Sequence, residues 1–144
     1  MIINDDFEIA EKFSFDGIHL GPNDQSCISA RKRFGKDFII GSSCSDSISL
    51  CIKSSNEGAN YLAFGPMFKT KNKNKNKIDI KKVLQIKKNI SLPFTLIGGI
   101  NHKNILKLQL IRPNYVAIID SLWNFKNGPE ESAKLFRKSL NERC

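Results

Sequence analysis

Short continuous runs of apolar residues recur six times along this 144-residue chain, and segments with helical spacing separate them. The runs are MII, GIHL, DFIIGS, NYLAFG, FTLIGG and YVAII, and the segments between them are EIAEKF, SCISARKRF, SISLCIKSSNEG, IDIKKVLQIKKN and NILKLQLI. Continuous runs are typical of parallel strands buried on both faces, and strands that alternate with helices form βαβ units. The sequence therefore predicts an α/β fold with a parallel sheet.

The expected element boundaries and the length of the chain agree with this fold class. Asp24 to Ser26 and Ser45 to Ser47 offer caps for the second and third helices, and Gly58 is expected just after the third helix. With 40% hydrophobic and 26% charged residues, the chain is expected to form one domain over residues 1–144. The spacing fits either a β/α barrel or a doubly wound sheet.

In a β/α barrel the chemistry lies at the C-terminal ends of the strands. The unusual residues of this sequence lie at the same places. They are Asn4-Asp5, Gly21 to Asp24, Gly41 to Ser43, Gly65 to Lys73, Gly98-Gly99 and Asp120-Ser121. The C-terminal strand ends are therefore the predicted location of the functional site.

Composition argues against several classes of protein. No apolar run reaches the roughly 18 residues of a membrane span, and the N-terminal segment MIINDDFEIA is acidic where a signal peptide is basic. A cytoplasmic protein with no membrane partner is expected. The four cysteines form no CxxC pair and have no histidine at metal-ligand spacing, which indicates reduced thiols. The net charge of +9 is compatible with nucleic acid or with phosphorylated small molecules and does not choose between them.

Six strand-end motifs together resemble those of the thiamine-phosphate synthase family, which includes the TenI-type thiazole tautomerases. In chain order they are IIND, DGIHLGPND, IIGSS, YLAFGPMFKTKNK, LIGGIN and VAIIDS. The resemblance runs from Met1 to about Phe136, and the synthase branch is the closer one. It implies a (β/α)8 barrel of the TIM type, shortened here to about six βα units. It also implies a transferase of thiamine biosynthesis that joins hydroxymethylpyrimidine diphosphate to thiazole phosphate with Mg²⁺ and releases pyrophosphate.

The resemblance implies a metal site at the first two strand ends. Asn4 stands at the position that contacts the pyrimidine, and Asp5 and Asp24 stand at the two magnesium-ligand positions. Carboxylate oxygens from neighbouring strand ends suit Mg²⁺, which completes its shell with diphosphate oxygens and water. The structural alternative is that Asp5 begins a loop and Asp24 caps a helix. The six motifs together favour the metal site.

Ser43 and Lys73 are the two residues that the resemblance places in catalysis. Ser43 matches a serine that contacts the diphosphate substrate, although a turn hydroxyl bonded to backbone would look the same in sequence. In the loop after the fourth strand, Thr70 and Lys73 are kept while Asn72 replaces a second threonine. The resemblance implies that positions 70 and 72 contact the thiazole phosphate and that Lys73 contacts the diphosphate. Lys77, further along, is expected to be solvated.

Residues after the fifth and sixth strands are expected near the thiazole phosphate. Gly99, preceded by Gly98, suits a backbone that approaches a phosphate closely, although a glycine turn that leaves a strand has the same appearance. Ile119 and Asp120 occupy the next substrate-binding position, where the family has a serine in place of the aspartate. A carboxylate there repels phosphate unless a cation is present or Ser121 substitutes for the serine.

The two histidines bear on the tautomerase alternative. That branch places a histidine two positions after the serine of the third strand motif, and the corresponding residue here is Ser45. His19 is expected to pack at a strand end, and His102 is expected at the surface. A histidine-dependent proton shuttle therefore lacks its base.

A missing motif and a basic tract leave two further alternatives open. The Gln-x-Arg-x-Lys strand of the family has no counterpart in the sequence. About two of eight βα units are therefore expected to be missing, and a second copy or a complementing chain is expected to cover the open edges. A catalytically impaired barrel that binds phosphorylated ligands is one alternative. A basic protein that binds nucleic acid through Lys71 to Lys88 is another, but this tract has no aromatic residues, which argues against specific nucleic-acid recognition.

Overall fold

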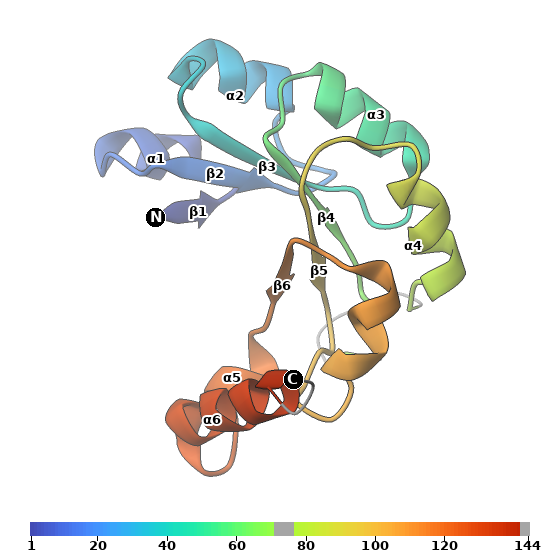
Figure 1. Ribbon diagram of the computed structural model, residues 1–144. Coiled ribbons are helices and arrows are strands. Elements are labelled where there is room, and N and C mark those ends of the chain that lie inside the picture. The colour runs from blue at the N-terminus through green and yellow to red at the C-terminus, as the bar shows by residue number, and fades with distance from the viewer. Residues whose placement is uncertain (71–76, 142–144) are drawn as a thin grey trace.

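The computed structural model describes residues 1–70 and 77–141 and shows a curved sheet flanked by helices (Figure 1). The strands are β1 (Ile2–Asn4), β2 (Gly17–Leu20), β3 (Ile39–Ser43), β4 (Tyr61–Phe64), β5 (Phe94–Ile97) and β6 (Tyr115–Ala117). The helices are α1 (Phe7–Lys12), α2 (Cys27–Phe34), α3 (Ile48–Asn56), α4 (Ile80–Lys87), the 3-10 helix η1 (Ile105–Ile111), α5 (Asp120–Trp123) and α6 (Gly128–Asn141). No helix in these two ranges is long and apolar enough to cross a membrane. The predicted alternation of strands and helices is confirmed.

The order of the strands separates the two architectures that the sequence left open. Within the described ranges the order is β1-β2-β3-β4-β5-β6, and each strand pairs in parallel with the next. A doubly wound sheet reverses its strand order, which places helices on both faces. Here the sheet curls, and α2, α3 and α4 cover its outer face (Figure 1). The architecture is that of a TIM-type barrel with six strands in the described residues, as predicted.

The hydrophobic core lies between the sheet and these helices. Alternate strand residues are fully buried, and they belong to one cluster with residues of the helices. The strand residues of this cluster are Ile18, Leu20, Ile40, Leu62, Phe64, Phe94 and Leu96, and the helix residues include Ala30, Cys51, Val83 and Ile86. Cys27, Cys44 and Cys51 are buried free thiols, in agreement with the prediction of reduced cysteines. The strand residues between them lie on the opposite, inner face of the sheet, and several of these residues are polar, such as His19, Ser43 and Tyr61.

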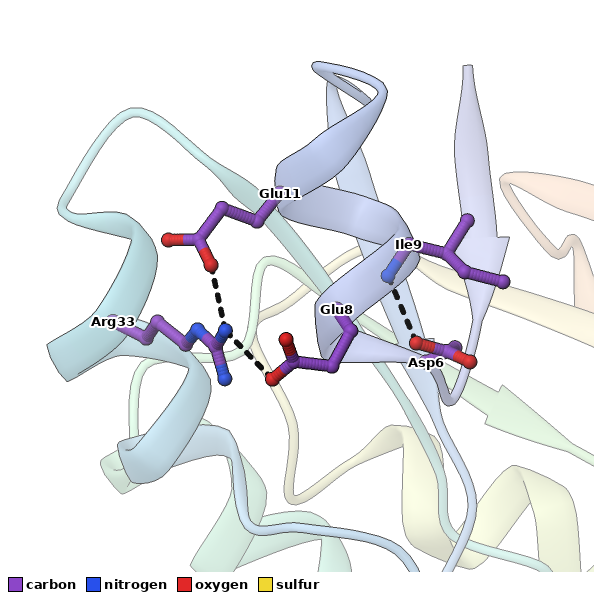
Figure 2. A network of polar contacts seen from close by, with 5 residues as sticks. All are labelled: Asp6, Glu8, Ile9, Glu11 and Arg33. Atoms are coloured by element: carbon purple, nitrogen blue, oxygen red, sulfur yellow. Dashed lines mark hydrogen bonds and ion pairs between the residues drawn. The ribbon is translucent and has the colours of Figure 1, made fainter.

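Capping residues begin and end the helices where the sequence predicts. Ser26 and Ser47 cap α2 and α3, and each side chain accepts a hydrogen bond from a backbone N–H of the first turn. Gly58 follows α3 with φ of +92°, a left-handed conformation that favours glycine. Asp6 caps α1 in the same way as the two serines, through the backbone N–H of Ile9 at 2.9 Å (Figure 2).

An exposed cluster of charges connects α1 with α2 (Figure 2). Arg33 Nη2 lies 2.8 Å from Glu8 Oε1 and 2.6 Å from Glu11 Oε2. Below this cluster the rings of Phe7 and Phe34 pack with centroids 5.2 Å apart. Exposed ion pairs contribute little to stability, so we expect the buried Phe7 ring to carry most of the contact energy.

Arg31 joins the two segments that precede β3 and β4. Its Nη1 atom donates hydrogen bonds to carbonyl oxygens of the loop between α2 and β3, and its Nη2 atom donates to acceptors just before β4. The acceptors are Gly35 O, Lys36 O, Phe38 O, Gly58 O and Asn60 Oδ1. Asn60 Oδ1 also accepts a hydrogen bond from the Ile40 backbone N–H at 2.8 Å. Arg31 therefore fixes the start of β4 relative to β3.

Candidate active site

The structure places the predicted site residues at one edge of the sheet, where the C-terminal ends of all the parallel strands meet. Asn4 and Ser43 are the last residues of β1 and β3, and the others follow β1, β2, β4, β5 and β6. The others are the loop residues Asp5, Asp24, Thr70, Gly99 and Ile119, and Asp120, which begins α5. The predictions for Asn72 and Lys73 fall outside the described residues. The same is true of Lys71.

Asp5 lies directly beyond the paired part of β1. Its backbone N–H donates to His19 O at 3.0 Å, which extends the β1–β2 ladder by one residue. Its φ of +64° lies in the left-handed region, which aspartate tolerates better than most side chains. Strain of this kind gathers at functional sites more often than elsewhere. The exposed carboxylate of Asp5 is therefore held at the strand end by the backbone itself.

Asp24 closes the loop that follows β2. Its Oδ2 atom accepts a hydrogen bond from the Gly21 backbone N–H at 2.5 Å, so the carboxylate is turned back toward the end of β2. The residue that caps α2 is Ser26, so the structural alternative in which Asp24 caps the helix is wrong. Because β1 and β2 are paired neighbours, Asp5 and Asp24 lie at adjacent strand ends.

A line of polar side chains crosses the inner face of the sheet from β2 to β4. His19 Nδ1 lies 2.9 Å from the Tyr61 hydroxyl oxygen, and His19 Nε2 lies 2.9 Å from Ser43 Oγ. All three side chains are half-buried. Burial also raises the pKa of Tyr61, so its phenol stays protonated at neutral pH. The expectation that His19 only packs at a strand end is wrong, because the histidine joins a tyrosine to a predicted substrate-binding serine.

Glycine at position 41 makes this contact possible. The strand register aligns Gly41 with His19 on one side and with Tyr61 on the other. A Cβ atom at position 41 would lie 2.1 Å from the Tyr61 ring, which shows that the ring lies across the glycine. A glycine inside a strand is a known sign of such close approach, and it was the one signal in the sequence that could have pointed to this contact.

The change of Gly41 to Ala is expected to destabilise the fold by about 2 kcal/mol, because the added methyl group must displace the Tyr61 ring within a packed sheet. Urea unfolding measures this loss. Gly35→Ala is the comparison for backbone strain, because a Cβ atom there meets nothing within 4 Å while its φ of +82° disfavours alanine, so any loss at Gly35 comes from the backbone and not from a clash. If Gly41→Ala is no less stable than wild type, the ring does not occupy this position.

A second group of predicted residues gathers around the loop after β5. Gly98 and Gly99 have φ of +91° and +65°, and a Cβ atom on Gly99 would lie 2.6 Å from Lys69 O. The close approach that these glycines permit is therefore to the loop that follows β4 and leads to Thr70. Ser121 Oγ donates to Ile100 O at 2.5 Å and so ties the start of α5, which follows β6, to the loop after β5.

Asp120 and His102 have different environments. The Asp120 carboxylate is exposed and accepts a hydrogen bond from Asn124 Nδ2 at 2.9 Å, while the adjacent Ser121 hydroxyl is already engaged. His102 was expected at the surface, but it is half-buried, and its ring packs edge-on against Phe125 and Phe136. The expectation for His102 is therefore wrong, and the ring helps to attach α6 to the loop after β5.

The family model and the curated relatives agree on one family. The family model described as thiamine monophosphate synthase matches residues 1–122. The thiamine-phosphate synthase of Pelagibacter ubique is 45% identical over 126 residues, which are 87% of this chain and 60% of that protein. The thiamine-phosphate synthase of Methylobacillus flagellatus is 34% identical over 98% of this chain and 67% of that protein. The solved structure of thiamine phosphate pyrophosphorylase from Pyrococcus furiosus superposes with a TM-score of 0.85 at 25% identity, and covers 98% of this chain and 67% of that one.

Proposed function

This chain belongs to the thiamine monophosphate synthase family, and from this premise we propose that it serves the synthase reaction of thiamine biosynthesis. In this reaction hydroxymethylpyrimidine diphosphate and thiazole phosphate give thiamine phosphate and pyrophosphate. The observation that carries the proposal is the match over residues 1–122, which includes all six strand ends. The chain spans 60% of the length of the Pelagibacter relative, so the activity of that whole protein comes to this chain as a proposal.

The task of these residues is to stabilise a leaving group and to hold two substrates in line. The pyrimidine loses pyrophosphate, and the thiazole nitrogen then forms the new C–N bond. No side chain needs to act as a nucleophile, so catalysis rests on positioning and on charge stabilisation. We assign the pyrimidine to Asn4 and the diphosphate to Ser43, which end β1 and β3 at the same edge of the sheet.

Asp5 and Asp24 fit a magnesium ion. Within residues 1–70 and 77–141 no group of three or more His, Cys, Asp or Glu side chains could hold a metal ion. Mg²⁺ needs fewer protein ligands than that, since it binds through one or two carboxylates and takes its remaining ligands from phosphates and water. Two exposed carboxylates at adjacent strand ends match this donor set. When bound, Mg²⁺ would neutralise charge on the diphosphate.

The thiazole phosphate is assigned to the loops after β4, β5 and β6. Ser121 in α5 is bonded to Ile100 O in the loop after β5, so Gly99, Ile119 and Asp120 belong to one connected region. Asp120 opposes an anion here, and the Ser121 hydroxyl is already bound to a carbonyl. We therefore expect weak binding of the thiazole phosphate by this chain, and stronger binding when Asp120 is changed to Ser.

The proposal is tested by incubating the purified chain with both substrates and Mg²⁺ and measuring thiamine phosphate. Because the 144 residues contain no Gln-x-Arg-x-Lys strand, a version extended by a family-type pair of βα units is assayed beside it. Asp24→Asn in each version is the inactive control. We expect product from the extended version and much less from the chain alone. No product from either version, with intact fold, would overturn the proposal.

A further inference from the structure

The line formed by Tyr61, His19 and Ser43 is more than packing, because each of its hydrogen bonds has good length and spans a different pair of strands. The two bonds measure 2.9 Å each and connect β4 to β2 and β2 to β3. Ser43 is the last residue of β3, so the line ends at the edge of the sheet where the candidate site lies. The neighbouring Ser42 points to the other face and bonds to Ser54 at 2.8 Å, so the two serines serve different purposes.

We propose that His19 and Tyr61 are positioning residues, which orient the Ser43 hydroxyl so that it donates a hydrogen bond to a phosphate group. This inference rests on the proposed function, since it takes the phosphate to belong to the diphosphate substrate. Ser43 touches the ligand, whereas His19 and Tyr61 act through it. The three residues form one unit that presents a single fixed donor.

The direction of the hydrogen bonds follows from the chemistry of the three groups. Tyr61 keeps its proton and can donate it to His19 Nδ1, because burial raises the pKa of the phenol. A neutral imidazole that accepts at Nδ1 carries its own proton at Nε2, which then donates to Ser43 Oγ. The serine proton is left free to point away from the histidine. Bonds aligned in one direction also polarise and strengthen one another.

The opposite arrangement would disable the serine. If His19 carried its proton at Nδ1, Nε2 would accept the Ser43 proton, and the serine could no longer donate to an anion. The phenol therefore selects the useful tautomer. An anion that accepts a hydrogen bond from the Ser43 hydroxyl favours the same tautomer of His19. Binding of the anion and the order of the hydrogen bonds therefore support each other.

The backbone fixes the phenol that begins the line. Tyr61 is the first residue of β4, and its partner in the register is Gly41, across which the ring lies. Asn60, just before it, is bonded to Ile40 through both its backbone N–H and its side chain, at 2.7 and 2.8 Å. The hydroxyl position is thus set by the sheet, which makes Tyr61 a suitable anchor for a positioning role.

The test compares two Tyr→Phe changes in the full chain. Tyr61→Phe removes only the hydroxyl of the line and keeps the ring. Tyr115→Phe makes the same change on β6, where the tyrosine also opens its strand, follows an asparagine and is 66% exposed. Calorimetry with inorganic pyrophosphate and Mg²⁺ measures the affinity of each variant. We expect about five- to tenfold weaker binding for Tyr61→Phe, as for the loss of one hydrogen bond, and no change for Tyr115→Phe.

The Ser43→Ala background shows whether Tyr61 acts through the serine. In that background Tyr61→Phe is expected to have no further effect on pyrophosphate affinity, because the group being oriented is gone. An undiminished effect of Tyr61→Phe in the Ser43→Ala chain would overturn the proposal. So would equal losses from Tyr61→Phe and Tyr115→Phe in the otherwise wild-type chain.

Nitrogen-15 NMR of the free wild-type chain gives a readout that needs no ligand. We expect the proton of His19 at Nε2, and a changed tautomer population in Tyr61→Phe but not in Tyr115→Phe. A proton at Nδ1 in wild type would overturn the proposal even if every variant folds and binds normally. Failure of wild type to bind pyrophosphate would overturn the phosphate role of Ser43, whereas the proposed function is decided by the synthase assay of the extended version and the hydrogen-bond order by the tautomer of His19.

Discussion

The Asp24→Asn variant is expected to bind pyrophosphate in the presence of Mg²⁺ about a hundredfold more weakly than wild type, as metal-site changes commonly do. Asparagine keeps a side-chain oxygen that can accept the hydrogen bond from the Gly21 N–H, so the loop after β2 is preserved. The change removes the charge that a hard divalent cation requires. Calorimetric titration of pyrophosphate with and without Mg²⁺ measures the loss of affinity. The loss should be confined to the part of the affinity that depends on Mg²⁺.

Asp5 and Asp6 provide the matched comparison for this prediction. Asp5→Asn should cause a similar loss, and asparagine tolerates the left-handed backbone at this position as well as aspartate does. Asp6→Asn removes the same charge one residue away, where asparagine caps α1 equally well, and should have little effect. If Asp5 and Asp24 share one ion, the double variant should lose far less than the sum of the single losses. A loss of the same size in Asp6→Asn would show that general charge, and not a shared ion, explains the binding.

Much of the fold could be predicted because its signals are local. Ser26, Ser47 and Gly58 act within one turn of their own helix ends, and each apolar run contains all or nearly all of the strand it predicts. The choice between a barrel and a doubly wound sheet depended on strand order, which no local pattern contains. Five predictions stay untested: the single domain over residues 1–144, the roles of the site residues, the magnesium ion, the cytoplasmic location, and the second copy or complementing chain at the edges of β1 and β6.

The site could be predicted only in part, because some of its contacts depend on how the strands are aligned. Residues at strand ends are marked by their place in the chain, so Asn4, Asp5 and Ser43 could be assigned to one edge. The contact between His19 and Tyr61 depends on two strand registers and on the missing side chain of Gly41 between them. The sequence contains that glycine, but its meaning appears only when the three strands are aligned.

The Arg31→Ala variant is expected to lose about 3 kcal/mol of its free energy of unfolding. Five acceptors bond to the guanidinium of Arg31, four of them backbone carbonyl oxygens, at 2.6 to 3.0 Å. Alanine leaves these groups to find other partners, and hydrogen bonds from a charged donor are stronger than neutral ones. The effect should reach beyond α2, because Asn60, which also bonds to the Ile40 N–H, loses one of its two donors.

Two neighbouring changes separate the geometry of Arg31 from its charge. Arg31→Lys keeps the charge, but an ammonium group cannot reach both the loop before β3 and the segment before β4, so most of the loss should remain. Lys32→Ala removes an exposed charge from the same helix and should change stability by no more than about 0.5 kcal/mol. Urea unfolding of the three variants measures these differences. Full stability in Arg31→Lys would contradict the prediction, because a single cation near Gly58 would then hold β4 in place without the planar, multiply bonded group.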